Sequence, residues 1–248
     1  MADPLGRKEN ELTLIQLLPN VLTITAICAG LSAIRFGVQG NYMLAVQLVM
    51  AACVLDGLDG RLARLLGSES KMGAELDSLA DFLNFGVAPS LILYFWALQD
   101  ITSAGWIAVL VFTVCCVMRL ARFNVSSKSE SEPQESAFFE GVPAPAGALL
   151  VMLPMYMSFA FTGAPLVPGT AICAYMVCIG LLLISRIPTW SFKTTKISRG
   201  NVKFFLVGVV FAGAAILTYA WASLIVLCLC YVAMVVWAWI DQDAHPKS

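Results

Sequence analysis

The acidic side chains of this sequence are concentrated in one short stretch, residues 56–81, which reads DGLDGRLARLLGSESKMGAELDSLAD. The stretch contains four aspartates and two glutamates, although charged residues make up only 12% of the 248-residue chain. Long apolar segments lie on both sides of it, and charge next to a membrane-spanning segment is costly and usually functional. The stretch is therefore the first candidate for a functional site.

The spacing of the four aspartates predicts that their side chains converge. If the stretch folds as two helices joined by a tight turn, Asp56 and Asp59 share one face of the first helix, since residues three apart are neighbours on a helix. Asp77 and Asp81 are four residues apart and share one face of the second helix. Four carboxylates in a small volume repel one another, so the arrangement predicts bound cations. Carboxylate oxygens suit hard cations, which favours Mg²⁺, Mn²⁺ or Ca²⁺, with two ions in one site.

Small residues and one arginine lie on the same two helix faces: Gly60, Ala63, Arg64 and Gly73. The lack of side-chain bulk at the small residues would let a diphosphate or a flat base approach the backbone closely. Arg64 is placed to pair with a phosphate. Paired metal ions stabilise the attacking and leaving oxygens in phosphoryl transfer. The pattern therefore favours chemistry on a phosphate ester at the membrane surface.

Two other interpretations of the acidic stretch have to be weighed. A single acid and base on a helix at the membrane surface is usually a solvated or snorkelling pair, but two aligned faces disfavour that reading for the whole stretch. Intramembrane acids also bind the coupling ions of transporters, usually near the middle of the bilayer and often within repeats. Here the sequence shows no repeat, and the acids lie at the ends of apolar segments. An ion-coupled transporter is therefore the alternative, and interfacial chemistry is favoured.

The composition identifies the chain as an integral membrane protein. Hydrophobic residues make up 59% of it and its mean hydropathy is +0.82, values too apolar for an ordinary soluble domain. We predict an all-α, polytopic membrane helix bundle with about eight transmembrane helices and no nucleic-acid partner. The expected spans are residues 19–36, 42–66, 71–98, 104–125, 143–163, 168–186, 203–220 and 222–240.

The distribution of Lys and Arg predicts how the chain is oriented in the membrane. With the N-terminus in the cytoplasm, every Lys and Arg except Arg35 lies on the cytoplasmic side, as the positive-inside rule requires. Both termini would then be cytoplasmic, and we expect the membrane to be the cytoplasmic (inner) membrane. The turn between the two acidic helices would also face the cytoplasm, with the polar connection at residues 126–142 lying over the site.

The acidic stretch also carries a recognisable motif. Between Asp56 and Asp81 the sequence reads D-x2-D-G-x2-A-R-x8-G-x3-D-x3-D, with eight fixed positions. This motif resembles the signature of the CDP-alcohol phosphotransferase family of integral membrane enzymes, and PNVLT at residues 19–23 resembles the start of the family's first span. The resemblance implies a six-helix catalytic core with a dinuclear metal site. Such a site transfers a substituted phosphate from a CDP-linked donor to an alcohol and releases CMP.

The resemblance also divides the chain into three expected parts. Residues 1–18 would form a cytoplasmic tail and an interfacial helix, and residues 19–200 would form the six-helix core. Residues 201–248 would add two transmembrane helices and a second cytoplasmic tail. Members of the family are commonly dimers, so we expect a homodimer surrounded by membrane lipids.

Roles for individual residues follow from the same resemblance. Metal ligands would be Asp56, Asp59, Asp77 and Asp81, binding Mg²⁺ or Mn²⁺, with Asp81 acting also as the general base. The proton of an alcohol is weakly acidic and needs an acceptor within hydrogen-bond reach, which Asp81 would supply. The CDP-diacylglycerol site would be lined by Asn20, Thr23, Gly60, Ala63, Arg64 and Gly73.

The acceptor alcohol is predicted from looser similarities. The segments DSLADFLNFGVAPS, RLARFNV, FFEGVPAPAGA and SRIPTWSFK resemble family members that transfer a phosphatidyl group to L-serine, giving phosphatidylserine and CMP. Arg119 and Arg122 are the candidates for binding the carboxylate of serine, with Asn84 as a weaker polar contact. The two arginines could equally anchor lipid phosphates at the cytoplasmic surface. Glycerol 3-phosphate, an inositol compound and choline remain alternative acceptors.

Overall fold

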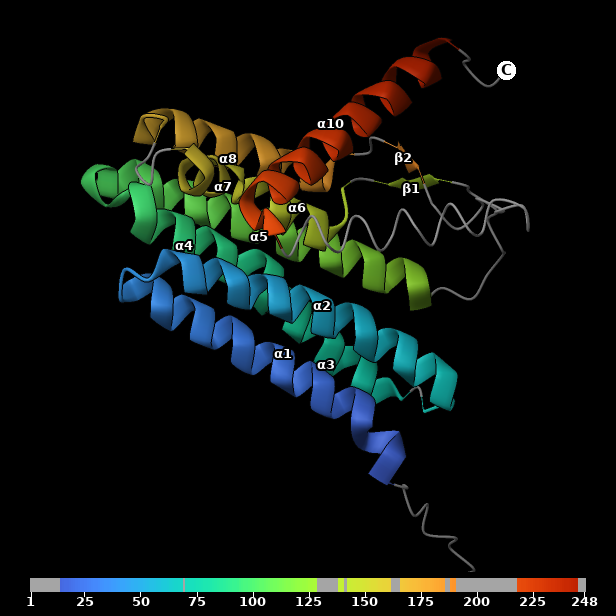
Figure 1. Cartoon of the computed structure of the whole chain (residues 1–248). Coiled ribbons are helices and arrows are strands. Elements are labelled where there is room, and N and C mark those ends of the chain that lie inside the picture. The colour runs from blue at the N-terminus through green and yellow to red at the C-terminus, as the bar shows by residue number, and fades with distance from the viewer. Residues whose placement is uncertain are drawn as a thin grey trace, which may run out of the picture.

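A computed structural model of the chain describes residues 14–68, 70–128, 138–140, 142–161, 166–185, 188–190 and 218–244. Nearly all of these residues are helical, and the helices of the first half lie side by side along their lengths (Figure 1). The only strands within the described residues are two of three residues each, which pair antiparallel as β1 and β2. The expected helical membrane bundle is therefore confirmed.

The elements differ in length along the chain, from long helices in the first half to shorter ones after α5. In chain order they are α1 (Leu14–Val38), α2 (Tyr42–Leu66), α3 (Lys71–Asp81), the π-helix η1 (Phe82–Val87), α4 (Ala88–Ala97), the 3₁₀-helix η2 (Gln99–Ile101), α5 (Thr102–Lys128), β1 (Phe138–Glu140), α6 (Ala144–Val151), α7 (Leu153–Phe161), α8 (Gly169–Ile184), β2 (Pro188–Trp190) and α10 (Ala220–Ala244).

Five helical runs in the described part of the chain are long and apolar enough to cross a membrane: α1, α2, the run from α3 to α4, α5 and α10. The helices α6 and α7 meet at a bend of 41° and make a sixth if they count as one span. The helix α8 coincides with the predicted span at 168–186 but has only 16 residues. The structure thus describes five or six of the eight expected spans.

Three of the predicted segments lie wholly or mostly outside the described residues. These are the N-terminal tail up to residue 13, most of the polar connection at 126–142, and the predicted span at 203–220 up to residue 217. The helix α1 begins at Leu14, so the end of the expected interfacial helix is continuous with the first span.

The local sequence explains the conformation of the turn that joins α2 to α3. Gly67 ends α2 with a φ of 58°, a left-handed conformation that glycine adopts without steric cost, and its N–H bonds back to the carbonyls of the last turn. Ser70 then caps the start of α3, because its hydroxyl accepts a hydrogen bond of 2.9 Å from the N–H of Gly73. These two caps confirm the predicted helical hairpin.

The third span changes its helical register directly after Asp81. The π-helix η1 occupies Phe82–Val87 and places one extra residue in a turn, a feature that often accompanies functional sites. The side chain of Asn84 in this segment is fully buried and packs against α1 at Gly30, where an added Cβ would collide with the Asn84 Oδ1 atom. The glycine therefore lets α1 approach η1 closely.

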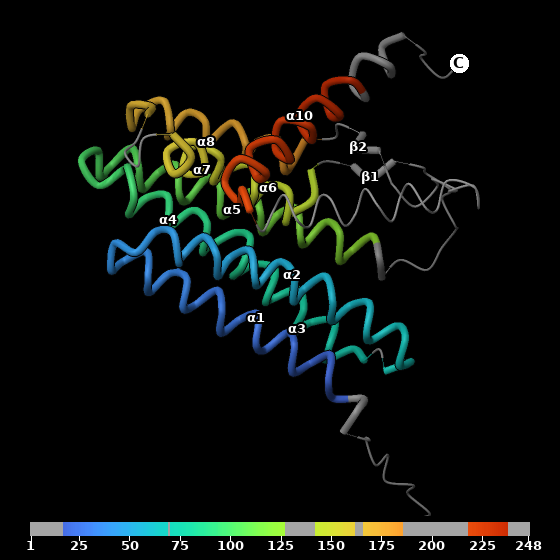
Figure 2. The backbone as a smooth tube through the Cα atoms, viewed as in Figure 1, coloured from blue at the N-terminus to red at the C-terminus, as the bar shows by residue number. Residues whose placement is uncertain are grey.

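The apolar core lies between the first spans and the helices α6 and α8, and its largest wholly buried side chains include Phe85, Phe112 and Tyr156. Many large apolar side chains, such as Val54 and Val125, are exposed instead. Such faces suit a lipid environment, where an exposed apolar side chain carries no penalty. The helix α10 packs mainly on α7 and lies across the second half of the bundle (Figure 2).

Candidate metal and nucleotide site

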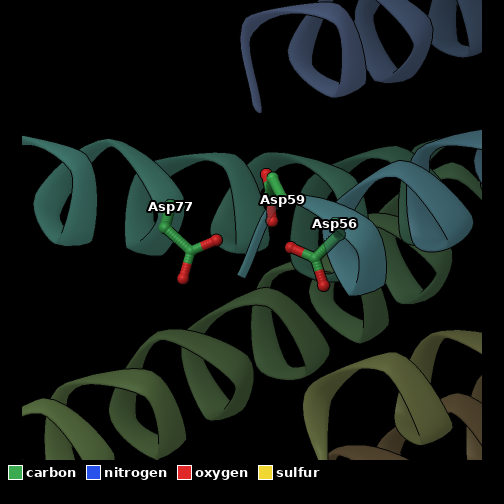
Figure 3. Close-up of side chains that lie close together, drawn as sticks. All are labelled: Asp56, Asp59 and Asp77. Atoms are coloured by element: carbon green, nitrogen blue, oxygen red, sulfur yellow. The ribbon is translucent and has the colours of Figure 1, made fainter. Parts of the chain in front are cut away.

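Three of the four predicted metal ligands meet in one group. One carboxylate oxygen from each of Asp56, Asp59 and Asp77 lies within 4.8 Å of the others (Figure 3). Asp56 and Asp59 come from α2 and Asp77 comes from α3. The hairpin therefore brings the acidic face of one helix next to the acidic face of the other, as the spacing predicts. Asp59 is only 2% exposed, and the other two are half-buried. This spacing allows one cation to contact all three carboxylates.

Asp81, the fourth predicted ligand, lies beside this group. Its carboxyl is within hydrogen-bond reach of the Asp56 carboxyl. One oxygen of Asp81 and one of Asp59 are buried and have no hydrogen-bond partner among the described residues. A buried carboxylate oxygen without a partner is costly, and a divalent cation satisfies it. The residues present therefore fit the hard, oxygen-preferring metal that the sequence predicts.

Thr23 connects α1 to the acidic group. Its hydroxyl lies 2.5 Å from Oδ2 of Asp59 and 3.1 Å from the backbone carbonyl of Pro19, and the side chain is 4% exposed. A hydrogen bond to a carboxylate fixes the direction of the oxygen that remains available to a metal. The sequence had suggested only that Thr23 lines the nucleotide site, and the structure adds this contact with a predicted metal ligand.

A cavity of about 280 Å³ opens between α1, α2 and α3 next to the acidic group. It contains five of the six residues predicted to line the CDP-diacylglycerol site, together with four residues that sequence reasoning missed. The predicted residues are Asn20, Thr23, Gly60, Ala63 and Gly73; those missed are Pro19, Ser68, Ser70 and Ala74; the aspartates Asp59 and Asp77 complete the lining. Ser68 and Ser70 lie in the turn between two fixed positions of the motif, Arg64 and Gly73. That location is the sequence feature from which their place in the cavity lining could have been predicted.

Two glycines shape this cavity. A Cβ atom added at Gly60 would have no heavy atom within 4 Å, so the glycine leaves open space on the cavity wall. At Gly73 an added Cβ would come within 3.0 Å of the Asn20 amide oxygen, so this glycine permits the close approach of α1 and α3. The first turn of α3 also lines the cavity, and the positive end of a helix dipole favours an anion there. The cavity therefore suits a negatively charged, diphosphate-containing ligand.

Arg64, the sixth predicted residue of the nucleotide site, is exposed and is not part of the cavity lining. Its Nε atom donates a hydrogen bond of 3.0 Å to the backbone carbonyl of Gly60, one turn earlier on α2. The guanidinium thus lies along the helix surface near the cavity wall. Its contact with a phosphate stays a prediction.

The three predicted acceptor residues occupy different surroundings. Arg119 on α5 is half-buried and interacts electrostatically with Asp81, and its Nε atom is buried without a hydrogen-bond partner in the described structure. Arg122 is exposed and donates two hydrogen bonds, of 3.2 and 3.3 Å, to the carbonyl of Ile184 at the end of α8. Asn84 is buried against α1. Of the three, the structure places Arg119 in electrostatic range of the acidic group.

The two sides of the acidic group differ. Figure 3 shows the carboxylates of Asp56 and Asp77 directed toward the side on which α5 passes, in the lower part of the view, whereas α1 lies on the opposite side. The cavity is on the α1 side, because Asn20 and Thr23 line it. The carboxylates therefore lie between this cavity and a region bounded by α5.

Comparison with known proteins agrees with this geometry. The family model described as CDP-alcohol phosphatidyltransferase matches residues 16–240. A Mycobacterium leprae protein named CDP-diacylglycerol–serine O-phosphatidyltransferase is 39% identical over 238 residues, which cover 94% of this chain and 79% of the relative. Proteins of the same name from Helicobacter pylori (strain 26695) and Bacillus subtilis are each 36% identical, over 79% and 71% of this chain and over 80% and 91% of their own length. The chain belongs to the CDP-alcohol phosphatidyltransferase family.

Proposed function

We propose that this enzyme is a phosphatidylserine synthase, which transfers the phosphatidyl group of CDP-diacylglycerol to the hydroxyl of L-serine and releases CMP. The observation that carries the reaction class is the group of three aspartates at the edge of a cavity lined by the family motif. The acceptor is supported by the relatives, which bear the name of the serine-transferring enzyme in three bacterial genera. Membership of this enzyme family also disfavours the transporter alternative.

We assign the metal ions to the acidic group itself, the CDP group to the cavity on its α1 side, and the acceptor to its α5 side. Asp56, Asp59, Asp77 and Asp81 would hold one or two divalent cations, Mg²⁺ or Mn²⁺. When bound, these ions would neutralise charge on the phosphates and stabilise the attacking and leaving oxygens. The cavity between α1, α2 and α3 would hold the CDP group, with the wall at Gly60 open to the nucleotide.

The acceptor would then approach from the α5 side. Its hydroxyl oxygen forms a bond to the phosphorus that carries the diacylglycerol, the bond from that phosphorus to the CMP oxygen breaks, and the hydroxyl proton passes to Asp81. Asp81 is the candidate for this role because its carboxyl lies beside the three aspartates, within hydrogen-bond reach of the Asp56 carboxyl.

We extend the proposal to the arrangement in the membrane. The enzyme would cross the inner membrane eight times with both termini in the cytoplasm, and residues 19–200 would form the catalytic core. The Lys and Arg distribution supports this orientation. The enzyme would form a homodimer. The acyl chains of CDP-diacylglycerol would remain in the bilayer during the reaction.

The function is tested by following CMP release from the purified protein with CDP-diacylglycerol, Mg²⁺ or Mn²⁺, and a panel of alcohols. We expect release with L-serine, and none after chelation of divalent metal. Release with glycerol 3-phosphate and none with serine would overturn the acceptor while leaving the reaction class in place. A lack of release with every alcohol, together with ion-driven solute uptake into liposomes, would support the transporter.

The contact between Thr23 and Asp59 leads to a prediction about metal affinity. In Thr23→Val, the shape of the side chain is kept but its 2.5 Å hydrogen bond to the carboxylate is lost. Loss of a group that orients a metal ligand typically weakens binding about 10- to 100-fold, so the metal concentration for half-maximal CMP release should rise by that factor. The rate at saturating metal should stay close to that of the wild type.

The matched control for this variant is Thr25→Val, on the same helix. The Thr25 hydroxyl donates to the backbone carbonyl of Val21 at 2.7 Å and is exposed. Its removal should leave the metal dependence unchanged. Equal metal dependence in all three proteins would show that Thr23 does not position Asp59.

A further inference from the structure

The last helix places an unexplained polar group inside the protein. Tyr231 on α10 is half-buried, and its hydroxyl oxygen is buried with no hydrogen-bond partner in the described part of the chain. A buried hydroxyl is costly unless it forms a hydrogen bond, so a ligand or a water molecule that reached this group would satisfy it. One side of the residue lines an apolar cavity with Val232 and Val235.

Arg119 is the charged group within electrostatic range of this tyrosine. It interacts electrostatically with Tyr231 and also with Asp81, the proposed general base. The Nε atom of Arg119, the hydroxyl of Tyr231 and one oxygen of Asp81 are all buried without a partner among the residues described. Three elements that are distant in the sequence, α3, α5 and α10, therefore contribute buried polar atoms without a partner, and the residues of α3 and α10 both lie within electrostatic range of Arg119.

The position of this region relative to the nucleotide cavity indicates what binds there. In an in-line displacement the attacking oxygen approaches the phosphorus from the side opposite the leaving group. The cavity proposed to hold CMP lies on the α1 side of the aspartates, and Asp56 and Asp77 are directed toward α5 (Figure 3). An acceptor in line with the CMP oxygen would therefore approach from the side of α5, the helix that carries Arg119.

We propose that Tyr231 and Arg119 form the subsite for the carboxylate of the acceptor, so that α10 contributes to acceptor selection. This inference rests on the proposed function. An arginine presents planar N–H donors that match a carboxylate, and the tyrosine O–H adds a donor to a further lone pair. A buried site with two donor groups discriminates against alcohols that have no anionic group to pair with them.

The test compares the two substrates in Tyr231→Phe, which removes one hydroxyl and keeps the ring. A hydrogen bond to a charged group accounts for about 10- to 100-fold in affinity, so the KM for serine should rise by that factor. The KM for CDP-diacylglycerol and the thermal unfolding midpoint should stay unchanged. Arg119→Lys keeps the charge but loses the planar donor pair, and it should show the same selective rise. In the double variant the two effects should not multiply, because both residues bind one carboxylate.

Tyr156→Phe is the matched control. Its hydroxyl is likewise buried and without a partner in the described structure, but its ring stacks near Trp221, with the ring centroids 6.5 Å apart. Both KM values should be unchanged in this variant.

Three outcomes would overturn the subsite. The first is an active Tyr231→Phe enzyme with an unchanged KM for serine, and the second is an equal rise in the KM of both substrates. In each of these cases the wild-type protein still releases CMP with serine, so the proposed function stands. The third is a wild-type protein that does not use serine, which would overturn the function and the subsite together.

Discussion

Asp77→Asn is expected to lower the rate of CMP release by about a thousandfold or more. The substitution keeps the size of the side chain but removes one of the three carboxylates whose oxygens lie within 4.8 Å of one another. A bound metal typically contributes several kcal/mol of charge stabilisation in the transition state, and about 4 kcal/mol corresponds to a thousandfold in rate. The rate is measured at saturating CDP-diacylglycerol and serine over a range of Mn²⁺ concentrations.

A thermal-shift measurement separates loss of metal binding from loss of the fold. Binding to the folded state raises the unfolding midpoint, so the wild-type midpoint should rise on addition of Mn²⁺ while that of Asp77→Asn should rise much less. Asp100→Asn is the matched control, because this acid is exposed in η2, outside the acidic group. An Asp77→Asn protein with the wild-type rate and the wild-type response to Mn²⁺ would exclude Asp77 as a ligand.

Gly60→Leu is expected to lower kcat/KM for CDP-diacylglycerol about 10- to 100-fold without lowering the stability of the protein. A side chain at this position meets no heavy atom within 4 Å of its Cβ, so it enters the cavity instead of clashing with a neighbouring helix. Filling a binding cavity with extra methylene groups typically costs about 1–3 kcal/mol in the bound complex. Leucine favours the helix over glycine by somewhat less than about 1 kcal/mol, so the unfolding midpoint should stay level or rise.

Gly57→Leu provides the comparison on the same helix. A Cβ at Gly57 also has no heavy atom within 4 Å, but this residue does not line the cavity. The two variants should therefore gain similar helix stability, and only Gly60→Leu should lose activity. Equal kcat/KM values in the two variants would show that the cavity wall at Gly60 does not contact the donor.

Much of the candidate site follows from local sequence rules. The spacing of Asp56 and Asp59 places both carboxylates on one helix face, and Gly67 with Ser70 provides the caps that reverse the chain. Because every one of these constraints acts over four residues or fewer, no knowledge of distant packing was needed to predict the hairpin and its acidic face. The observed bounds of α2, Tyr42–Leu66, coincide with the predicted span.

Other features depend on contacts between helices that are far apart in the sequence. The hydrogen bond from Thr23 to Asp59 joins residues 36 positions apart. The two predicted serine-binding arginines are one helical turn apart on α5, yet Arg119 interacts electrostatically with Asp81 while Arg122 donates a hydrogen bond to the carbonyl of Ile184 at the end of α8. The π-helix after Asp81 has no local sequence signal that we could identify. None of these outcomes follows from residue spacing within one helix.

The sequence by itself determined the membrane class, the acidic hairpin and most of the residues that line the cavity between α1, α2 and α3. Only the tertiary structure decided which side of the carboxylates faces α5, which arginine interacts with Asp81, and that Tyr231 on α10 lies within electrostatic range of that arginine. The physical reason is that lipid and protein interior are equally apolar. A membrane helix such as α10 therefore carries little amphipathic pattern to show which of its faces is buried, and its orientation is set by packing against other helices.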